Sequence, residues 1–241
     1  MPSEKELDHL HRIVEALEAS DRLGTKTIPQ YLDYEAPPVN ETEWLRYSCI
    51  PVYSQEEAKK DPVLSTSMAK ALSLVSDVLS FRVGFLVVPL SWDEEGYPVF
   101  PFDQKSENLR RNLEGCEKTV LFAATIGSGI DRLIRRYEKA DPRLGLLLQG
   151  LGAERVESLC DCFNAEVEKA AAGMRSAASD QVDPATRRRY SPGYGDLPIE
   201  VQREFLPLLD AERRLGITLS DSCLMAPSKS VTAIIGIDKE A

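Results

Sequence analysis

The stretch of sequence best suited to binding chemistry is RRYSPGYGDLP, which runs from Arg188 to Pro198. Pro192 and Pro198 lack amide hydrogens and disfavour helix at the residue before them. A central strand is excluded for a similar reason, because a proline cannot donate a hydrogen bond to a neighbouring strand. The sequence therefore predicts a stiff loop, which is either an ordinary turn or a place where an anionic group docks.

Arg189 and the residues after it supply the groups that would contact such a ligand. The planar guanidinium of an arginine holds a carboxylate through two parallel hydrogen bonds, which a lysine cannot reproduce. Gly193 lets a ligand approach the backbone closely, and we expect the amides of Ser191, Gly193 and Tyr194 to face it. These residue types favour a small ligand that carries a carboxylate.

Other side chains that could do chemistry are poorly placed for it. The two histidines, His9 and His11, are far in the sequence from every other candidate, which argues against Ser-His-Asp or Cys-His catalysis and against a histidine-rich metal site. Cys160 and Cys162 are two positions apart on a predicted helix, so they point to different sides and cannot chelate one ion. The five cysteines show no C-x-x-C spacing and are expected to be free, buried thiols. We therefore expect no catalytic residue and no bound metal.

A second glycine-containing turn, TIGSGIDR at 125–132, follows a predicted strand and precedes a predicted helix. Amides at the start of a helix attract anions, so this turn could bind a phosphate. However, the third glycine and the downstream acidic residue of the dinucleotide-binding fingerprint are missing. We interpret it as a tight turn between a strand and a helix.

Composition limits the class of protein. The chain has 241 residues, of which 43% are hydrophobic and 28% charged, and this predicts one large globular domain or a domain with an extension. Its net charge of −10 would repel nucleic acid, apart from local basic groups at 132–136 and 187–189. No stretch of about 18 apolar residues predicts a membrane span, and the N-terminus lacks the apolar core of a secretory signal. We expect a cytoplasmic protein that binds neither nucleic acid nor membrane.

The elements that position the loop follow from hydrophobic periodicity and from helix end signals. Ser3 and Glu6 predict a capping box at the start of the first helix, and Gly24 its end. Residues 25–53 are interpreted as a connecting segment with a short helix. Strands and helices do not alternate regularly, which predicts an α+β fold. The further predicted helices are 62–79, 106–115, 142–177 and 199–215, with another that follows a glycine turn within 126–140. The predicted strands are 82–90, 118–125 and 230–237, with another that follows a turn within 93–100.

The loop motif and three other stretches together resemble a known family. RYSPGYGDLP resembles the R-x-x-P-G-Y loop of the activation, or reactivation, domain of cobalamin-dependent methionine synthase. CEKTVLFAATIG, VESLCD and LGITLSDSCLMAPSKSVTAIIGI agree with that family in order and spacing, so that the resemblance covers roughly residues 80–237. It implies a bent, mainly antiparallel sheet flanked by helices, with residues 1–60 as an N-terminal helical extension and linker and 61–241 as the activation-domain-like part. An acidic segment near the start of the family's domain has no counterpart in residues 1–60.

The resemblance also implies a ligand and the residues that contact it. In this family S-adenosylmethionine binds on the surface of the sheet. Arg189 would hold its carboxylate, the backbone of Ser191 and Gly193 would contact its amino acid and adenosine parts, and Tyr194 would line the site. Glu157, within VESLCD, matches an acidic residue that faces the positively charged end of the ligand; alternatively it is a solvated helix glutamate.

In the family, the domain caps the cobalamin-bearing module after the cofactor has been oxidised to cob(II)alamin. A flavodoxin or ferredoxin-like donor supplies an electron, S-adenosylmethionine supplies a methyl group, and cobalamin is carried by the partner. The leading hypothesis is a stand-alone activation subunit, an accessory of methionine biosynthesis, for a methionine synthase that lacks its own activation domain. The alternatives are an S-adenosylmethionine-binding sensor or interaction protein, or an activator of another corrinoid methyltransferase. An ordinary methyltransferase is disfavoured, because Thr125 stands where its acidic signature residue is expected.

Overall fold

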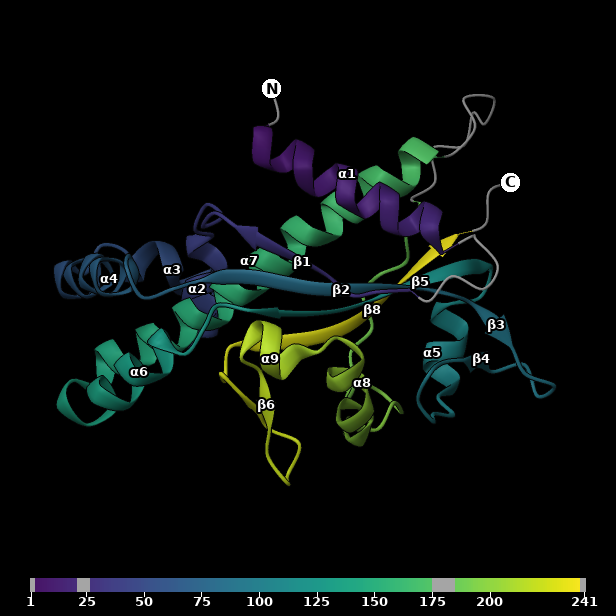
Figure 1. The fold of residues 1–241 in the computed structure, drawn as a ribbon. Helices are drawn as coiled ribbons and strands as arrows, with labels where there is room; N and C mark the ends of the chain where they lie inside the picture. The colour runs from purple at the N-terminus through teal and green to yellow at the C-terminus, as the bar shows by residue number, and fades with distance from the viewer. Residues whose placement is uncertain (1–2, 21–26, 175–184, 239–241) are drawn as a thin grey trace.

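The computed structural model describes residues 3–20, 27–174 and 185–238 (Figure 1). A four-stranded sheet lies at its centre, in the order β1-β2-β5-β8, and each pair of neighbours is antiparallel. The sheet with its flanking helices confirms the predicted α+β class. The strands are β1 (Gln30–Tyr34), β2 (Phe81–Pro89), β5 (Cys116–Thr125) and β8 (Ser230–Asp238).

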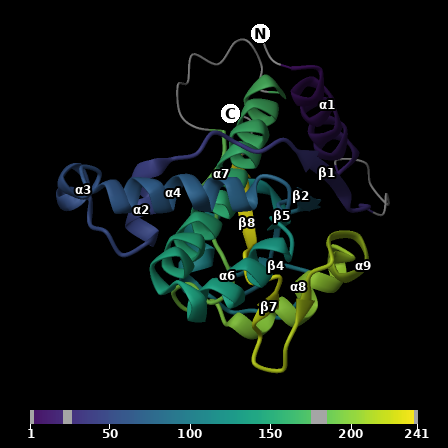
Figure 2. The same ribbon diagram turned by 90° about the vertical axis from the view of Figure 1, so that its left-hand side faces the viewer.

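Helices on both faces explain why the central strands are apolar along most of their length. Strand β5 has nine buried residues out of ten, the pattern of a strand covered on both faces. On one face the long helix α7 (Pro142–Met174) contacts four other helices and the sheet (Figures 1 and 2). The helices of this layer are α1 (Glu4–Ala19), α2 (Glu41–Tyr47), α3 (Val52–Ala58), α4 (Pro62–Val75) and α6 (Gly129–Ala140).

A second hydrophobic core lies on the opposite face of the sheet, below it in Figure 1. It joins Leu121 of β5 and Ile234 of β8 to helix residues such as Leu109 and Phe205, all fully buried. The elements on this side are α5 (Glu107–Asn112), the 3₁₀ turn η1 (Ile199–Val201), α8 (Gln202–Leu208) and α9 (Ala211–Leu215), with two short hairpins, β3–β4 (Ser91–Trp92 and Pro98–Val99) and β6–β7 (Thr218–Leu219 and Met225–Ala226).

The N-terminal part departs most from the prediction. The capping box of Ser3 and Glu6 is confirmed, whereas the predicted helix end at Gly24 lies outside the described residues. The short helix predicted within 25–53 is confirmed as α2, but the interpretation of the rest as a connecting segment is wrong, because β1 lies within it and pairs with β2 along the edge of the sheet. Its sequence QYLDY buries only Leu32 completely, so it carries little hydrophobic signal. The division at residue 60 stays a prediction, although residues before it belong to the main core.

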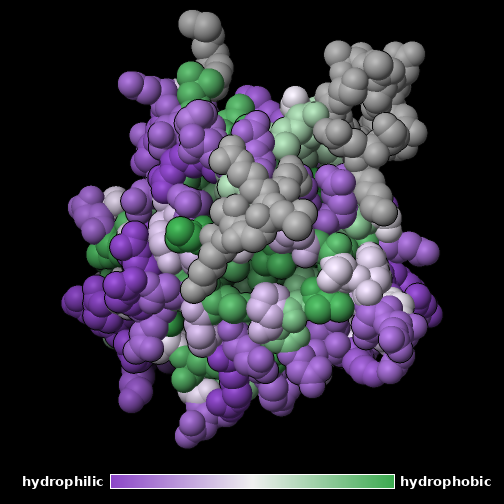
Figure 3. Space-filling model, turned by 45° about the vertical axis from the view of Figure 1, so that its right-hand side comes forward, coloured by the Kyte–Doolittle hydropathy of each residue, from purple (hydrophilic) through white to green (hydrophobic). Residues whose placement is uncertain are grey.

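On the face shown in Figure 3, hydrophilic side chains surround a smaller group of hydrophobic ones near the centre. No helix in the described ranges has both the length and the apolar character needed to cross a membrane. The five cysteines are free, as predicted, and Cys116, Cys160 and Cys223 are buried, but Cys49 is exposed.

A buried ion pair fastens the segment before α2 to α7. Glu154 and Arg155 are 1% and 3% exposed, and Arg155 Nε lies 2.5 Å from Glu154 Oε2. Arg155 also donates hydrogen bonds to the carbonyls of Pro37 and Pro38, while Glu154 accepts one from the amide of Asn40. The guanidinium of Arg155 and the carboxylate of Glu154 thus each have hydrogen-bond partners besides one another. A buried ion pair is tolerated only when such additional hydrogen bonds are present.

We predict that Arg155→Ala lowers the free energy of unfolding by about 3–5 kcal/mol, since it leaves the Glu154 carboxylate buried without its counter-ion. Lys60→Ala is the matched control. It breaks the exposed pair of Lys60 with Glu57, and we expect a loss of at most about 0.5 kcal/mol. Urea unfolding followed by circular dichroism measures both, and equal effects of the two changes would contradict the structural role of the buried pair.

Candidate functional site

The segment that leads into the predicted loop is held against the edge of the sheet. The amide of Tyr190 donates to the carbonyl of Ile234 in β8, and the amide of Ile234 donates back to Tyr190, each at 2.8 Å. Thr186 forms a second bridge, to Ile237. Successive side chains of an extended segment point to opposite faces. Tyr190 therefore packs into the second core, while Arg189 points to the other face, toward α7.

Arg189 is bound by two carboxylates of α7. Its Nη2 lies 2.5 Å from Glu157 Oε2, and its Nη1 lies 2.7 Å from Asp161 Oδ1. Glu157 and Asp161 are four positions apart and so share one face of the helix. Partial burial lowers the pKa of Arg189, but the hydrogen bond to Asp161 and the neighbouring acidic groups raise it more, so the pKa is shifted upward. The group stays charged, and the three side chains carry a formal net charge of −1.

The loop closes on itself after Arg189, which corrects one expectation. The amide of Gly193 donates to the carbonyl of Leu197 at 2.9 Å, and the amide of Tyr194 donates to Ser191 at 3.0 Å. These two amides therefore do not face a ligand, because the loop itself uses them. Of the three amides that were expected to face a ligand, these loop hydrogen bonds leave only that of Ser191 free.

Gly193 is required by conformation and by packing. Its φ of +86° lies in the left-handed region, and a Cβ there would stand 2.9 Å from Cδ1 of Ile199. The next residue, Tyr194, is 69% exposed, with its ring edge-on to that of Tyr190 at 5.6 Å. The hydroxyl of Tyr190 donates to the carbonyl of Tyr194 at 3.1 Å. The loop thus presents an aromatic ring at the surface on a fixed backbone.

These contacts bring the predicted residues into two adjoining groups. Arg189 and Glu157 touch directly, while Ser191, Gly193 and Tyr194 follow on the loop. Asp161 was missed, although its spacing of four from Glu157 was a usable signal. The arrangement suits a small molecule with both a carboxylate and a cationic group, because such a ligand can exchange partners with the existing ion pairs. Among Glu157, Asp161, Arg189, Ser191, Gly193 and Tyr194, no hydrogen bond pairs a nucleophile with a base.

The other glycine turn lines a cavity elsewhere on the molecule. A hollow of about 600 Å³ lies between the start of α6 and the β6–β7 hairpin, and none of its lining residues belongs to the Arg189 loop. Gly129 is needed there for packing, since a Cβ would meet the carbonyl oxygen of Val78 at 2.1 Å. This supports the interpretation of TIGSGIDR as a tight turn. Asp131, Arg135 and Glu138 give the hollow groups of both signs.

The structure is an α+β domain with a charged group of side chains, Arg189, Glu157 and Asp161, beside the edge strand of an antiparallel sheet. Residues 108–241, more than half of the chain, match the family model described as the vitamin B12 dependent methionine synthase activation domain. The chain belongs to this family. Among solved structures it is similar to the crystal structure of the MetH reactivation domain bound to AdoHcy, with a TM-score of 0.65 and 17% identity over 92% of this chain and 81% of that one. At this identity the likeness shows the fold. A comparison with curated proteins found no match.

Proposed function

We propose that this chain is the activation subunit of a cobalamin-dependent methionine synthase that lacks its own activation domain. The family supports a role beside a cobalamin-bearing module. The single observation that carries the proposal at the level of residues is the ion-paired Arg189 at the base of the RYSPGY loop, with Glu157 on Nη2 and Asp161 on Nη1.

The charges of this site fit S-adenosylmethionine. That ligand has one carboxylate, one ammonium and one sulfonium group, a net charge of +1 against −1 for the three side chains. Its carboxylate would take a place on Arg189, and its cationic groups would face Glu157 and Asp161, so that no charge is left without a partner. The backbone of Ser191, whose amide the loop hydrogen bonds leave free, and the ring of Tyr194 would line the rest, and Gly193 would contribute through its lack of a side chain and not through its amide. The related reactivation domain of known structure is described as bound to AdoHcy.

The contribution of the chain is positioning. When the partners meet, one electron from a flavodoxin or ferredoxin-like donor and the methyl group of S-adenosylmethionine convert cob(II)alamin on the partner to methylcobalamin, and S-adenosylhomocysteine is released. Arg189 and the α7 carboxylates hold the ligand by its amino acid end, and the closed loop fixes where the ligand lies relative to the incoming module. Holding two reactants in place lowers the barrier through proximity and orientation.

Two other functions use the same site. An S-adenosylmethionine sensor would bind the ligand without assisting any methylation. An activator of another corrinoid methyltransferase would act on a different cobalamin protein. The family match favours the methionine synthase.

We predict that the protein binds S-adenosylmethionine and that Arg189→Ala weakens binding by about 1.5–3 kcal/mol, because a charge-assisted pair with the ligand carboxylate is lost. Arg213→Ala is the control, since Arg213 forms an exposed ion pair with Asp210 on α9 and lies outside the site. Titration calorimetry gives both dissociation constants. Equal weakening by the two changes would remove Arg189 from the ligand site.

The activation role predicts a second result. A cognate synthase without an activation domain, held as cob(II)alamin with a reducing system and S-adenosylmethionine, should regain methylcobalamin only when this protein is added. The visible spectrum of the cobalamin against time measures the recovery. Equal recovery without the protein would refute activation, and recovery with an unrelated corrinoid methyltransferase alone would favour the alternative partner.

A further inference from the structure

We propose that Asp196 is a positioning residue for this site, which clamps the far end of the ligand-binding loop onto helix α5. The expected effect on ligand binding rests on the proposed function, whereas the contacts of Asp196 with α5 are a property of the fold. The carboxylate of Asp196 contacts the start of α5, and none of its hydrogen bonds is made with Arg189, Glu157 or Asp161.

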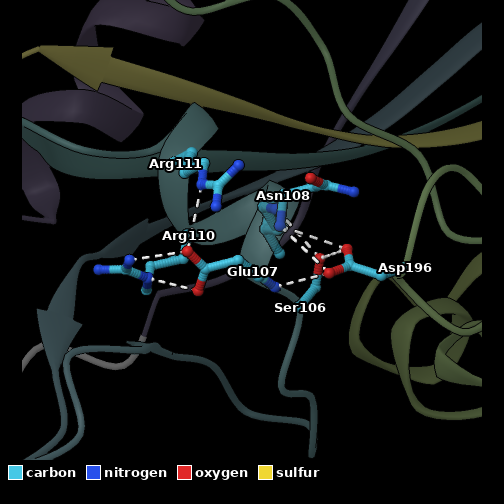
Figure 4. Close-up of polar contacts among 7 residues, drawn as sticks. Ser106, Glu107, Asn108, Arg110, Arg111 and Asp196 are labelled. Carbon is cyan, nitrogen blue, oxygen red and sulfur yellow. Dashed lines mark hydrogen bonds and ion pairs between the residues drawn. The ribbon is translucent and has the colours of Figure 1, made fainter.

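The contacts of Asp196 are made with one short stretch of chain about ninety positions earlier (Figure 4). Its carboxylate accepts hydrogen bonds from the hydroxyl of Ser106, from the amide of Glu107 at 2.8 Å and from the amide of Asn108 at 3.3 Å. Ser106 is fully buried. One carboxylate of the loop therefore holds three donors at the start of α5.

The helix does not need Asp196 for an ordinary N-cap. Ser106 already serves as the N-cap, with its hydroxyl accepting from the amide of Leu109 at 3.0 Å. The amides of Glu107 and Asn108 remain, and in an isolated helix these would bond to water. The carboxylate of Asp196 accepts these hydrogen bonds in place of water and so connects the loop to α5. The hydrogen bond from Ser106, with those from the two amides, lowers the pKa of Asp196, so the carboxylate is ionised throughout the neutral range.

Gly195 shows that the loop and α5 are pressed closely together. Its φ is +57°, and a Cβ at this position would lie 2.4 Å from the hydroxyl oxygen of Tyr190 and 2.9 Å from Nδ2 of Asn108. Tyr190 is in turn fixed to β8 by two backbone hydrogen bonds. The loop is thus held at one end by the sheet and at the other end by α5.

Tyr194 lies between the two anchoring residues, Tyr190 and Asp196, and Arg189 directly precedes Tyr190. A loop that is already ordered loses less conformational entropy when a ligand binds, so the affinity is higher than for the same loop released at one end. Groups that contact a ligand keep their geometry only when a supporting layer of contacts holds them. Release of Asp196 should therefore weaken ligand binding without removing any group that touches the ligand.

The test compares Asp196→Ala with a matched carboxylate cap elsewhere. Asp61 caps α4 by accepting from the amide of Val63 at 2.9 Å, and it lies outside the site, so Asp61→Ala removes a similar interaction. We expect Asp196→Ala to weaken S-adenosylmethionine binding by about 5- to 30-fold in calorimetry, and Asp61→Ala to leave binding within about 2-fold of the wild type, with similar falls in the melting temperature. Asp196→Asn, which keeps one acceptor oxygen, should give an intermediate affinity.

A second measurement does not depend on the ligand. The amides of Gly193 and Tyr194 are hydrogen-bonded within the loop, and their hydrogen exchange should be faster in Asp196→Ala than in Asp61→Ala. A wild type that fails to bind S-adenosylmethionine would overturn the proposed function, and the exchange rates would then decide on the clamp alone. Unchanged exchange would overturn the clamp. Faster exchange with unchanged ligand affinity would overturn the positioning role.

Discussion

The site depends on the pairing of Tyr190 with Ile234 of strand β8. Because the backbone of Tyr190 is bonded to Ile234, the ring of Tyr190 must enter the core below the sheet and Arg189 must point to the helix layer above it. A shift of one residue would bury the guanidinium and expose the ring. The two hydrogen bonds between Tyr190 and Ile234 thus decide which side chain meets α7. Glu157 and Asp161 can form ion pairs with Arg189 only in that register.

The electrostatics of the site differ from those of the protein as a whole. A chain with a net charge of −10 repels anions on average, so a carboxylate-bearing ligand needs a local cation that is held in place. Arg189 is such a cation, but two acidic residues surround it. A ligand with only a carboxylate would have to displace Glu157 or Asp161 from Arg189, and the displaced carboxylate would then lack a partner. A ligand with a carboxylate and two cationic groups could pair with Arg189, Glu157 and Asp161 together, and this charge match is the reason for proposing a zwitterion with an additional positive charge as the ligand.

The sequence predicted the parts of the fold whose signal is local. Long apolar runs predicted β2, β5 and β8, and the proline-glycine pattern predicted the loop. Strand β1 was missed because a half-exposed edge strand with one fully buried side chain has no distinctive pattern. The internal hydrogen bonds of Gly193 and Tyr194 could not be predicted, since they depend on how the loop closes. The contact of Asp196 with Ser106 joins residues ninety positions apart, and no local pattern reports it.

The most direct test of the account is a crystal structure of the protein with S-adenosylmethionine. We expect the ligand to lie between α7 and the loop, with its carboxylate on the guanidinium of Arg189 and its cationic groups toward Glu157 and Asp161. The cavity of about 600 Å³ between the start of α6 and the β6–β7 hairpin is an alternative place for the ligand. Ligand bound in that cavity, with the ion pairs of Arg189 unchanged, would contradict the assignment of the site.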